Sequence, residues 1–140
     1  MLTEYDGAFG VKTGFTKQAG RCLVSAAERN GMSLICTVLN CSDTYGESKK
    51  LLDDAFAAYD LSLLQAAESP VPLDTKAGKI SAKTGKDLRY PLLSAEQPYV
   101  KKTTIAFDSP LKDGNGREIY GQLRIYLANS LLFSENLYKL

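Results

Sequence analysis

The sequence predicts an α+β protein in which an antiparallel hairpin and a helix are followed by a small all-β sandwich domain. Three observations indicate this arrangement. Two apolar segments flank an Asn-Gly pair at 30–31, an amphipathic segment follows at 47–64, and short segments with turn residues between them fill the chain beyond residue 68. The 140 residues fit one ordinary domain or two small ones. We expect two parts, residues 1–67 and residues 68–140.

The hairpin is predicted over residues 20–29 and 32–39. Asn30-Gly31 lies between these two segments. Asn-Gly favours a type I′ turn, because both central residues of that turn need a positive φ. A two-residue turn pairs Arg29 with Met32 and fixes the register of the whole hairpin.

The helix is predicted over residues 47–64. Thr44 with Glu47 three residues later resembles a capping box, and Asp43 is an alternative cap. The apolar residues recur at the spacing of one helix face, and this stripe consists of Leu51, Leu52, Ala55, Phe56 and Tyr59.

The second half reads as short strands separated by turns. Pro70 and Pro72 end helical order. Between 119 and 127 the odd positions are apolar or glycine and the even positions are polar or tyrosine, which is typical of a strand with one buried face. We expect a turn at 112–116 and strands at 78–84, 86–93, 98–107, 117–128 and 131–138.

Composition excludes several classes of function. The chain has no histidine, which removes Ser-His-Asp and Cys-His catalysis and most zinc sites; we expect no metal and no cofactor. The net charge of +1 gives no bulk attraction to nucleic acid or membranes. No apolar run approaches the ~20 residues of a membrane helix, and the first residues lack the apolar core of a signal peptide.

The three cysteines are expected to be unpaired core residues. Their number is odd, and none forms a C-x-x-C pair. In the predicted register Cys36 lies opposite Ser25, which is an odd number of residues from Cys22. Cys22 and Cys36 therefore point to opposite faces of the sheet, and a bridge between them is not expected.

A Lys-Thr-Gly triplet occurs at residues 12–14 and again at 83–85. On a strand, Lys12 and Gly14 point to one face and Thr13 points to the other. Such a strand offers an ammonium, a hydroxyl and backbone N–H groups, which suit an anionic peptide-like ligand lying alongside. By itself a three-residue match arises often by chance. We expect the second copy to be a hairpin turn.

The longer stretch around the first triplet is more specific. "YDGAFGVKTGFTKQAGRCLVSAAERNGMSLICTVLN" (5–40) and "ESKKLLDDAF" (47–56) resemble the D-alanyl-D-alanine carboxypeptidases, the low-molecular-weight penicillin-binding proteins of serine peptidase type. The family pattern D-G-x-x-G-[IV]-K-T-G-x-T-x-x-A-G matches residues 6–20. The resemblance is close to about residue 65. It implies the end of a transpeptidase-like catalytic domain, followed by the family's C-terminal β-sandwich domain.

The resemblance also implies roles for individual residues. In this family a serine attacks the penultimate D-Ala carbonyl and an acyl-enzyme forms. Lys12 would place positive charge near the terminal carboxylate of the substrate, and Thr13 would hydrogen-bond that carboxylate. The backbone N–H of Phe15, after Gly14, would be one half of the oxyanion hole. Thr16 is expected to bind substrate as well.

The sequence departs from the family in its other motifs. S-x-x-K and S-x-N precede K-T-G in the family, but only eleven residues precede Lys12. The formal matches are Ser109-Pro110-Leu111-Lys112, in a predicted strand end and turn, and Ser134-Glu135-Asn136, near the C-terminus. We expect neither to act. The chain is thus interpreted as the C-terminal portion of a carboxypeptidase, without a nucleophile and inactive alone.

The resemblance sets the expected partners and location. The parent protein would act on peptidoglycan stem peptides, bind β-lactams and be exported to the cell envelope, with signal and membrane anchor outside this chain. Without the helices that cover its sheet in the family, the chain would expose an apolar face, so we expect self-association. The alternative function is a non-catalytic, β-rich spacer or interaction module of the envelope.

Overall fold

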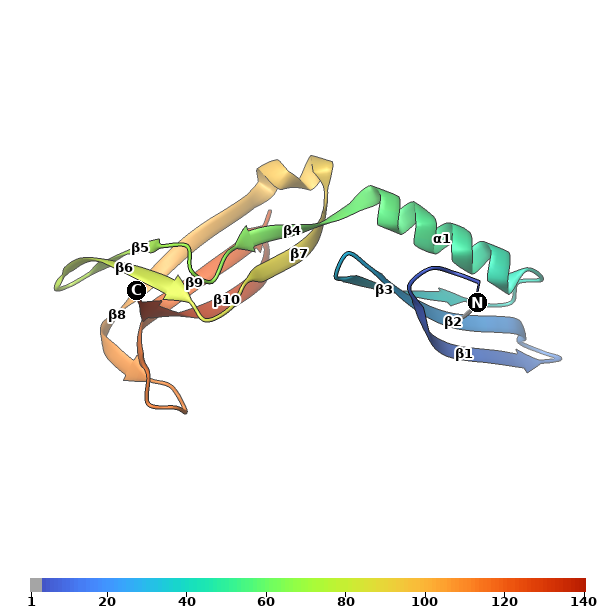
Figure 1. The fold of residues 1–140 in the computed structure, drawn as a ribbon, viewed down its shortest axis with the longest axis horizontal. Helices are drawn as coiled ribbons and strands as arrows, with labels where there is room; N and C mark the ends of the chain where they lie inside the picture. Colours follow the sequence, from blue (N-terminus) through green and yellow to red (C-terminus); the bar gives the residue numbers. More distant parts are fainter. Residues whose placement is uncertain (1–3) are drawn as a thin grey trace. The chain divides into compact units, whose positions relative to one another are not determined.

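The computed structural model describes residues 4–140 and is mostly β, with one α-helix among the described residues (Figure 1). This confirms the predicted fold class. Contacts divide the chain into two compact units, Met1–Leu61 and Ser62–Leu140. Within the described part, no helix has the length and apolar character needed to cross a membrane.

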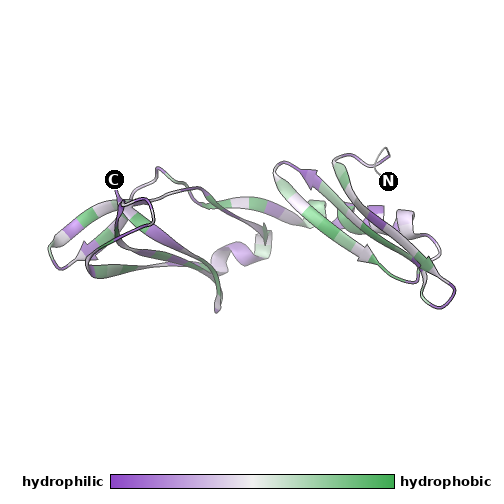
Figure 2. Cartoon of the chain, turned by 90° about the horizontal axis from the view of Figure 1, so that it is seen from below, coloured by the Kyte–Doolittle hydropathy of each residue, from purple (hydrophilic) through white to green (hydrophobic). Residues whose placement is uncertain are grey.

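The first unit is a three-stranded antiparallel sheet with a helix on one face (Figure 1). The sheet order is β1-β2-β3, so β1 lies at an edge. The helix α1 packs on β2 and β3, and apolar stretches mark the strands (Figure 2). The elements are β1 (Ala8–Thr16), β2 (Gly20–Arg29), β3 (Met32–Val38) and α1 (Thr44–Ala58).

The predicted hairpin and its register are confirmed, except that the second strand ends at Val38 and not at Leu39. Arg29 pairs with Met32, and Ser25 pairs with Cys36. The turn residues Asn30 and Gly31 have φ of 51° and 79°, which are the positive values that a type I′ turn requires. The three cysteines are free, as expected, but only Cys36 is a buried core residue; Cys22 and Cys41 are half-buried, so their expected place in the core was wrong.

The predicted helix begins earlier and ends earlier than expected. Asp43 is the N-cap, and its Oδ1 accepts a hydrogen bond from the N–H of Gly46 at 2.9 Å, so the alternative cap was correct. The helix ends at Ala58, and Tyr59–Gln65 forms strand β4. The prediction to residue 64 was wrong because β4 pairs with a distant strand and buries Leu64 in the second unit.

The core of the first unit joins the helix to the sheet. Leu52 of α1, 2% exposed, packs with Ala27, Cys36 and Val38 of the strands and with Tyr5. The buried hydroxyls of Ser25 on β2 and Ser48 on α1 hydrogen-bond to each other. Because buried polar groups need partners, this pair fixes the position of the helix on β2. Of the predicted apolar stripe, Leu51 and Tyr59 remain exposed.

The second unit contains a five-stranded and a two-stranded sheet. The larger sheet has the order β5-β6-β10-β9-β8 and is antiparallel throughout, whereas β4 and β7 form the smaller one. The elements are β5 (Val71–Thr75), β6 (Gly78–Thr84), β7 (Leu88–Leu93), the 3-10 helix η1 (Ser94–Tyr99), β8 (Val100–Lys112), β9 (Glu118–Leu127) and β10 (Ser130–Lys139).

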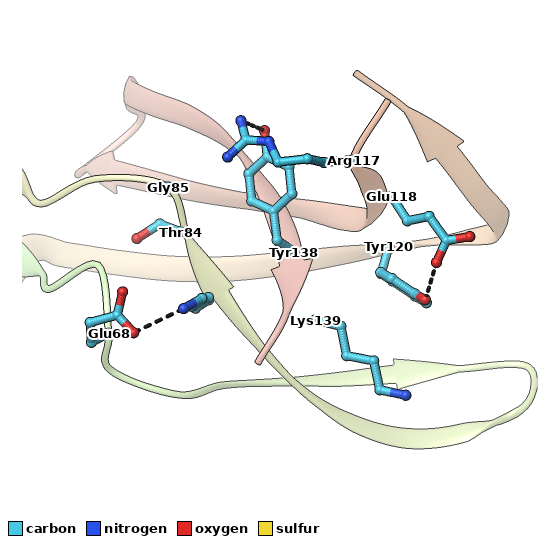
Figure 3. A pocket seen from close by; sticks show the side chains of 9 residues that line it. Glu68, Thr84, Gly85, Arg117, Glu118, Tyr120, Tyr138 and Lys139 are labelled. Carbon is cyan, nitrogen blue, oxygen red and sulfur yellow. Dashed lines mark hydrogen bonds and ion pairs between the residues drawn. The ribbon is translucent and has the colours of Figure 1, made fainter. Parts of the chain in front are cut away.

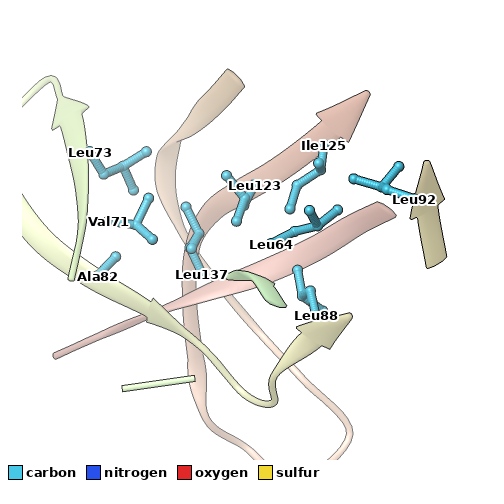
Figure 4. Packing of buried hydrophobic residues seen from close by; sticks show 9 residues of the cluster. All are labelled: Leu64, Val71, Leu73, Ala82, Leu88, Leu92, Leu123, Ile125 and Leu137. Atoms are coloured by element: carbon cyan, nitrogen blue, oxygen red, sulfur yellow. The ribbon is translucent and has the colours of Figure 1, made fainter. Parts of the chain in front are cut away.

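Leucine and other aliphatic side chains of the two sheets form the core of this unit (Figure 4). The alternation predicted for 119–127 is confirmed, since Ile119, Leu123 and Ile125 on β9 are buried. Nine buried residues make up the cluster: Leu64, Val71, Leu73, Ala82, Leu88, Leu92, Leu123, Ile125 and Leu137.

Two turn predictions had different outcomes. The turn at 112–116 is present, and the Asp113 carboxylate holds it by accepting from the N–H groups of Asn115 and Arg117, each at 2.9 Å. The second Lys-Thr-Gly is not a hairpin turn, because β6 pairs with β5 and β10 while β7 pairs with β4. Lys83 and Thr84 end β6, and Gly85 begins the connection to β7.

Candidate functional site

The first Lys-Thr-Gly triplet lies in the middle of edge strand β1. Lys12 pairs with Val24, Thr13 with Leu23 and Gly14 with Cys22. Within residues 4–140 the other edge of β1 has no strand partner. An edge strand presents backbone N–H and C=O groups with which an extended peptide can pair.

The register assigns each side chain of the triplet to a face. Leu23 pairs with Val38, which packs with Leu52 of the helix, so Thr13 lies on the helix side. Directly paired residues share a face of an antiparallel sheet, and Lys12 and Gly14 therefore lie on the opposite, open face.

A hollow of about 320 Å³ lies at the triplet. Thr13, Gly14 and Phe15 of β1 border it, together with Arg21 and Cys22 of β2 and the helix start at Thr44 and Tyr45. The exposed residues of β1 thus lie next to the positive end of a helix dipole and to the Arg21 guanidinium. The Asp43 carboxylate already caps this helix start, so the Arg21 guanidinium is the charge bordering the hollow that can attract a negatively charged group.

Lys12 does not border this hollow, and on the open face of β1 its charge is not compensated by a carboxylate. Its side chain is exposed, and its Nζ donates to the carbonyl oxygen of Thr13 at 2.9 Å. No carboxylate of residues 4–140 forms an ion pair with it. The ammonium keeps donor capacity for a further acceptor.

Thr16 already has a structural partner. Its Oγ1 accepts a hydrogen bond from the N–H of Ala19 at 2.8 Å and so shapes the turn between β1 and β2. Such hydroxyl-to-backbone bonds are typical of turns. Its expected contact with substrate stays a prediction, as do the expected roles of Lys12, Thr13, Gly14 and Phe15.

The glycines of the motif fall into two groups. Gly7 and Gly20 have φ of +78° and +67°, and a Cβ on them would overlap the Glu28 carbonyl oxygen and the Asn40 Oδ1. The fold itself therefore requires glycine at both positions. At Gly10 a Cβ would meet nothing within 4 Å, and at Gly14 it would lie 3.9 Å from the Cβ of Cys22, an ordinary contact.

Gly14 is thus not explained by packing in the described chain. Its φ is outside the left-handed region, and glycine weakens a strand relative to alanine. A strand glycine without a packing reason often marks close approach of another backbone or of a ligand. Here that approach would be to the open face beside Lys12.

The two other formal motif matches lie in the second unit. Ser109 is an exposed residue of β8, and Ser134 is an exposed residue of β10. Neither begins a helix. Ser134 Oγ contacts Gln122 Oε1 at 3.5 Å. That neither serine acts as a nucleophile or proton-transfer group stays a prediction.

Sequence reasoning missed a second hollow, of about 510 Å³, in the second unit (Figure 3). Lys83, Thr84 and Gly85 border it with Arg117, Tyr120 and Tyr138. The second Lys-Thr-Gly triplet is the local signal for it in the sequence, and the prediction of a turn there gave it no role in binding.

Strand β1 is thus a candidate peptide- or acyl-binding strand of the penicillin-binding type. It lies at the edge of an antiparallel sheet, it exposes Lys-Thr-Gly, and a helix packs on one face of the sheet. Residues 1–43 match the family model described as D-alanyl-D-alanine carboxypeptidase, peptidase family S11. The recognition made from the sequence is therefore confirmed: the chain is related to the D-alanyl-D-alanine carboxypeptidases and corresponds to a part of such a protein.

Individual relatives agree with this. The chain is 32% identical over 99 residues to D-alanyl-D-alanine carboxypeptidase DacF of Bacillus subtilis, covering 69% of this chain and 24% of the relative. It is 54% identical over 39 residues to a D-alanyl-D-alanine carboxypeptidase of a Streptomyces species, covering 28% of this chain and 13% of the relative. The chain thus spans a quarter or less of the length of these curated relatives.

Solved structures extend the likeness to the whole chain. The D-alanyl-D-alanine carboxypeptidase DacD of Francisella tularensis is similar with a TM-score of 0.65 at 29% identity, covering 99% of this chain and 37% of that one. Penicillin-binding protein 5 of Haemophilus influenzae is similar with a TM-score of 0.64 at 26% identity, covering 96% and 42%. Both units of the chain therefore have counterparts in these two solved structures.

Proposed function

We propose that this chain supplies the Lys-Thr-Gly strand of a serine-type D-Ala-D-Ala carboxypeptidase, which removes the terminal D-Ala of peptidoglycan stem peptides. The observation that carries the proposal is β1 itself: an edge strand whose Lys12 is unpaired and whose Gly14 has no packing reason. The division into a catalytic-domain part, 1–67, and a β-rich part, 68–140, is proposed with it.

The reaction proceeds through an ester. A serine hydroxyl attacks the penultimate D-Ala carbonyl, the C–N bond breaks, and the serine proton is passed to the leaving D-Ala amine. Water then cleaves the ester and restores the serine. The S-x-x-K and S-x-N groups lie outside these 140 residues, and this chain alone is inactive.

Three groups of β1 act on the substrate. At the free edge of β1, which their side chains flank from the two faces of the sheet, Lys12 and Thr13 hold the terminal carboxylate through a charge-assisted and a neutral hydrogen bond. The N–H of Phe15 stabilises the negative oxygen that develops on the attacked carbonyl. Gly14 lets the substrate backbone approach the strand, and a β-lactam occupies the same place as the peptide. Because peptidoglycan lies outside the cytoplasmic membrane, the protein works in the cell envelope.

The test is a substitution in the parent enzyme, with a matched lysine as control. Lys12→Gln removes the charge, whereas Lys17→Gln changes an exposed lysine of the β1–β2 turn. Since a hydrogen bond to a charged group contributes about 1.5–3 kcal/mol, we expect kcat/KM for D-Ala release to fall roughly 10- to 100-fold for Lys12→Gln. Equal activity of the two variants would refute the role of Lys12.

The inactivity of the isolated chain is tested separately. Intact mass after incubation with a penicillin is expected to show no adduct. A stoichiometric adduct would mean that a serine in these residues is activated, and Ser109 would then be the first to substitute.

We propose further that the isolated chain self-associates through the open sheet face. Ile35 lies on that face and is 75% exposed, and Leu39 beyond the end of β3 is 68% exposed. Such apolar exposure favours association. Size-exclusion chromatography with light scattering is expected to show a dimer that Ile35→Thr weakens and that Leu131→Thr, at an exposed leucine of the second unit, leaves intact. A monomer at high concentration would contradict this.

A further inference from the structure

The hollow in the second unit has the construction of a ligand site. It lies where the end of β6, the start of β9 and the end of β10 come together (Figure 3). Its volume of about 510 Å³ is within the range of small-molecule sites. Two aromatic rings, Tyr120 and Tyr138, and several charged side chains border it.

Three lining residues of the hollow, Thr84, Arg117 and Tyr138, are held in place by hydrogen bonds. Thr84, 1% exposed, donates from its hydroxyl to the carbonyl oxygen of Lys86 at 2.9 Å. The Arg117 guanidinium lies over the Tyr138 ring, 4.4 Å from its centroid. The Tyr138 hydroxyl donates to the Asp113 carboxylate at 3.3 Å, and Arg117 Nε donates to the same carboxylate at 2.8 Å. Binding of a ligand would therefore lose little conformational entropy from these side chains.

The rim alternates positive and negative groups. Lys83 Nζ forms an ion pair with Glu68 at 2.9 Å. Glu118 accepts from the Tyr120 hydroxyl at 2.6 Å. Lys139 is exposed and forms no ion pair with any residue of 4–140. The lining thus has three positive and two negative side chains, so donors and acceptors both surround the hollow and its net charge is only +1.

This pattern selects the chemistry of the ligand. A small anion would meet the carboxylates of Glu68 and Glu118, and a small cation would meet Lys83, Arg117 and Lys139. A neutral ligand with many hydroxyl and amide groups can donate to the carboxylates and accept from the cations at the same time. Its C–H faces can pack on the Tyr120 ring, which has an apolar body, whereas the Arg117 guanidinium already covers one face of Tyr138.

We propose that this hollow binds a neutral saccharide. The site is distinct from the Lys-Thr-Gly strand of β1 and does not depend on the carboxypeptidase reaction. Only the choice of probe rests on the proposed function: because the glycan of peptidoglycan consists of N-acetylated amino sugars, N,N′-diacetylchitobiose is the sugar to test.

The experiment is a titration of the isotope-labelled 140-residue chain with this disaccharide, followed by amide chemical shifts in NMR spectra. We expect saturable shifts at Gly85, Tyr120 and Lys139. Glu118→Gln and Lys139→Ala are expected to raise Kd at least fivefold. Lys101→Ala, at an exposed lysine of edge strand β8, is the matched control and is expected to leave Kd unchanged.

Three results would overturn the proposal. They are the absence of saturable shifts, an equal effect of the control variant, and shifts of the same amides by an anionic stem peptide but not by the disaccharide. Failure here is separable from failure of the proposed function, because Glu118→Gln in the parent leaves the Lys-Thr-Gly strand and D-Ala release untouched.

Discussion

Two glycines of one motif, Gly7 and Gly14, are predicted to respond in opposite ways to substitution by alanine. At Gly7 the φ of +78° places alanine in the left-handed region, which costs roughly 1–2 kcal/mol. The new Cβ would also overlap the Glu28 carbonyl oxygen. The Glu28 N–H donates to the Gly7 carbonyl at 2.9 Å, and weakening that bond costs about 1 kcal/mol more.

At Gly14 the same substitution is expected to stabilise the fold. The backbone lies outside the left-handed region, and the nearest atom to the new Cβ is Cys22 Cβ at 3.9 Å. Alanine is better than glycine in a strand by about 0.5–1 kcal/mol. The free energies of unfolding of the two variants should therefore differ by about 3 kcal/mol.

Urea unfolding followed by circular dichroism of the helical signal measures this difference, because α1 is the one α-helix of residues 4–140. With a slope of about 2 kcal/mol per molar, the midpoints should differ by about 1.5 M. In the parent enzyme, Gly14→Ala should lower kcat/KM roughly a hundredfold by displacing the substrate. A Gly14→Ala variant as destabilised as Gly7→Ala would show that Gly14 serves the fold, and would remove the observation on which the proposed function rests.

Three further predictions concern stability. Burial and the Asp53 hydrogen bond raise the pKa of Tyr5 to about 12 in the folded protein. Because the tyrosine of the unfolded chain is deprotonated at lower pH, the free energy of unfolding should fall as the pH rises from about 10 to about 12. Chemical denaturation of Tyr5→Phe over the same pH range should show a smaller fall. Leu137→Ala, at a residue with no exposed surface, should cost about 2–5 kcal/mol in chemical denaturation, and a smaller loss would mean that the core collapses around the cavity. Asp43→Ala removes the cap of α1 and should cost about 1 kcal/mol, whereas Asp54→Ala on the exposed side of the helix should cost much less.

Local chemistry allowed some elements to be predicted from the sequence. Asn30-Gly31 fixes a turn of two residues, and that turn alone fixes the register of β2 and β3. The alternation of β9 is equally local, since one face of the strand is buried. These elements depend on neighbours in the chain, so the sequence contains the information needed to recognise them.

Other features depend on partners that are distant in the chain. Residues 59–64 continue an apolar pattern that suits a helix or a strand, and pairing with β7 decides for the strand. The saccharide hollow exists only because β10 pairs with both β6 and β9, which brings Tyr138 to Gly85 and Arg117. The Lys-Thr-Gly triplet at 83–85 marks only one border of the hollow. The pairing of the distant strands is not encoded by any short motif, and therefore sequence reasoning missed the hollow.

The two Lys-Thr-Gly triplets differ in how far the fold itself uses their side chains. In the second copy the fold already uses the groups: Lys83 is paired with Glu68, and the Thr84 hydroxyl is buried and bonded. A Cβ on Gly85 would lie 3.6 Å from the Tyr138 ring.

In the first copy the corresponding groups remain available. Lys12 forms no ion pair within residues 4–140 and donates to the neighbouring carbonyl of Thr13, Thr13 is exposed, and Gly14 leaves an open face beside Lys12. An exposed lysine on a strand is common. Lys12 has no ion-pair partner within residues 4–140, and Gly14 stabilises the strand less than alanine would. Neither residue is therefore explained by the stability of the fold, and binding of a ligand would explain both. The arrangement of β1 therefore supports substrate binding there more strongly than the triplet's sequence does.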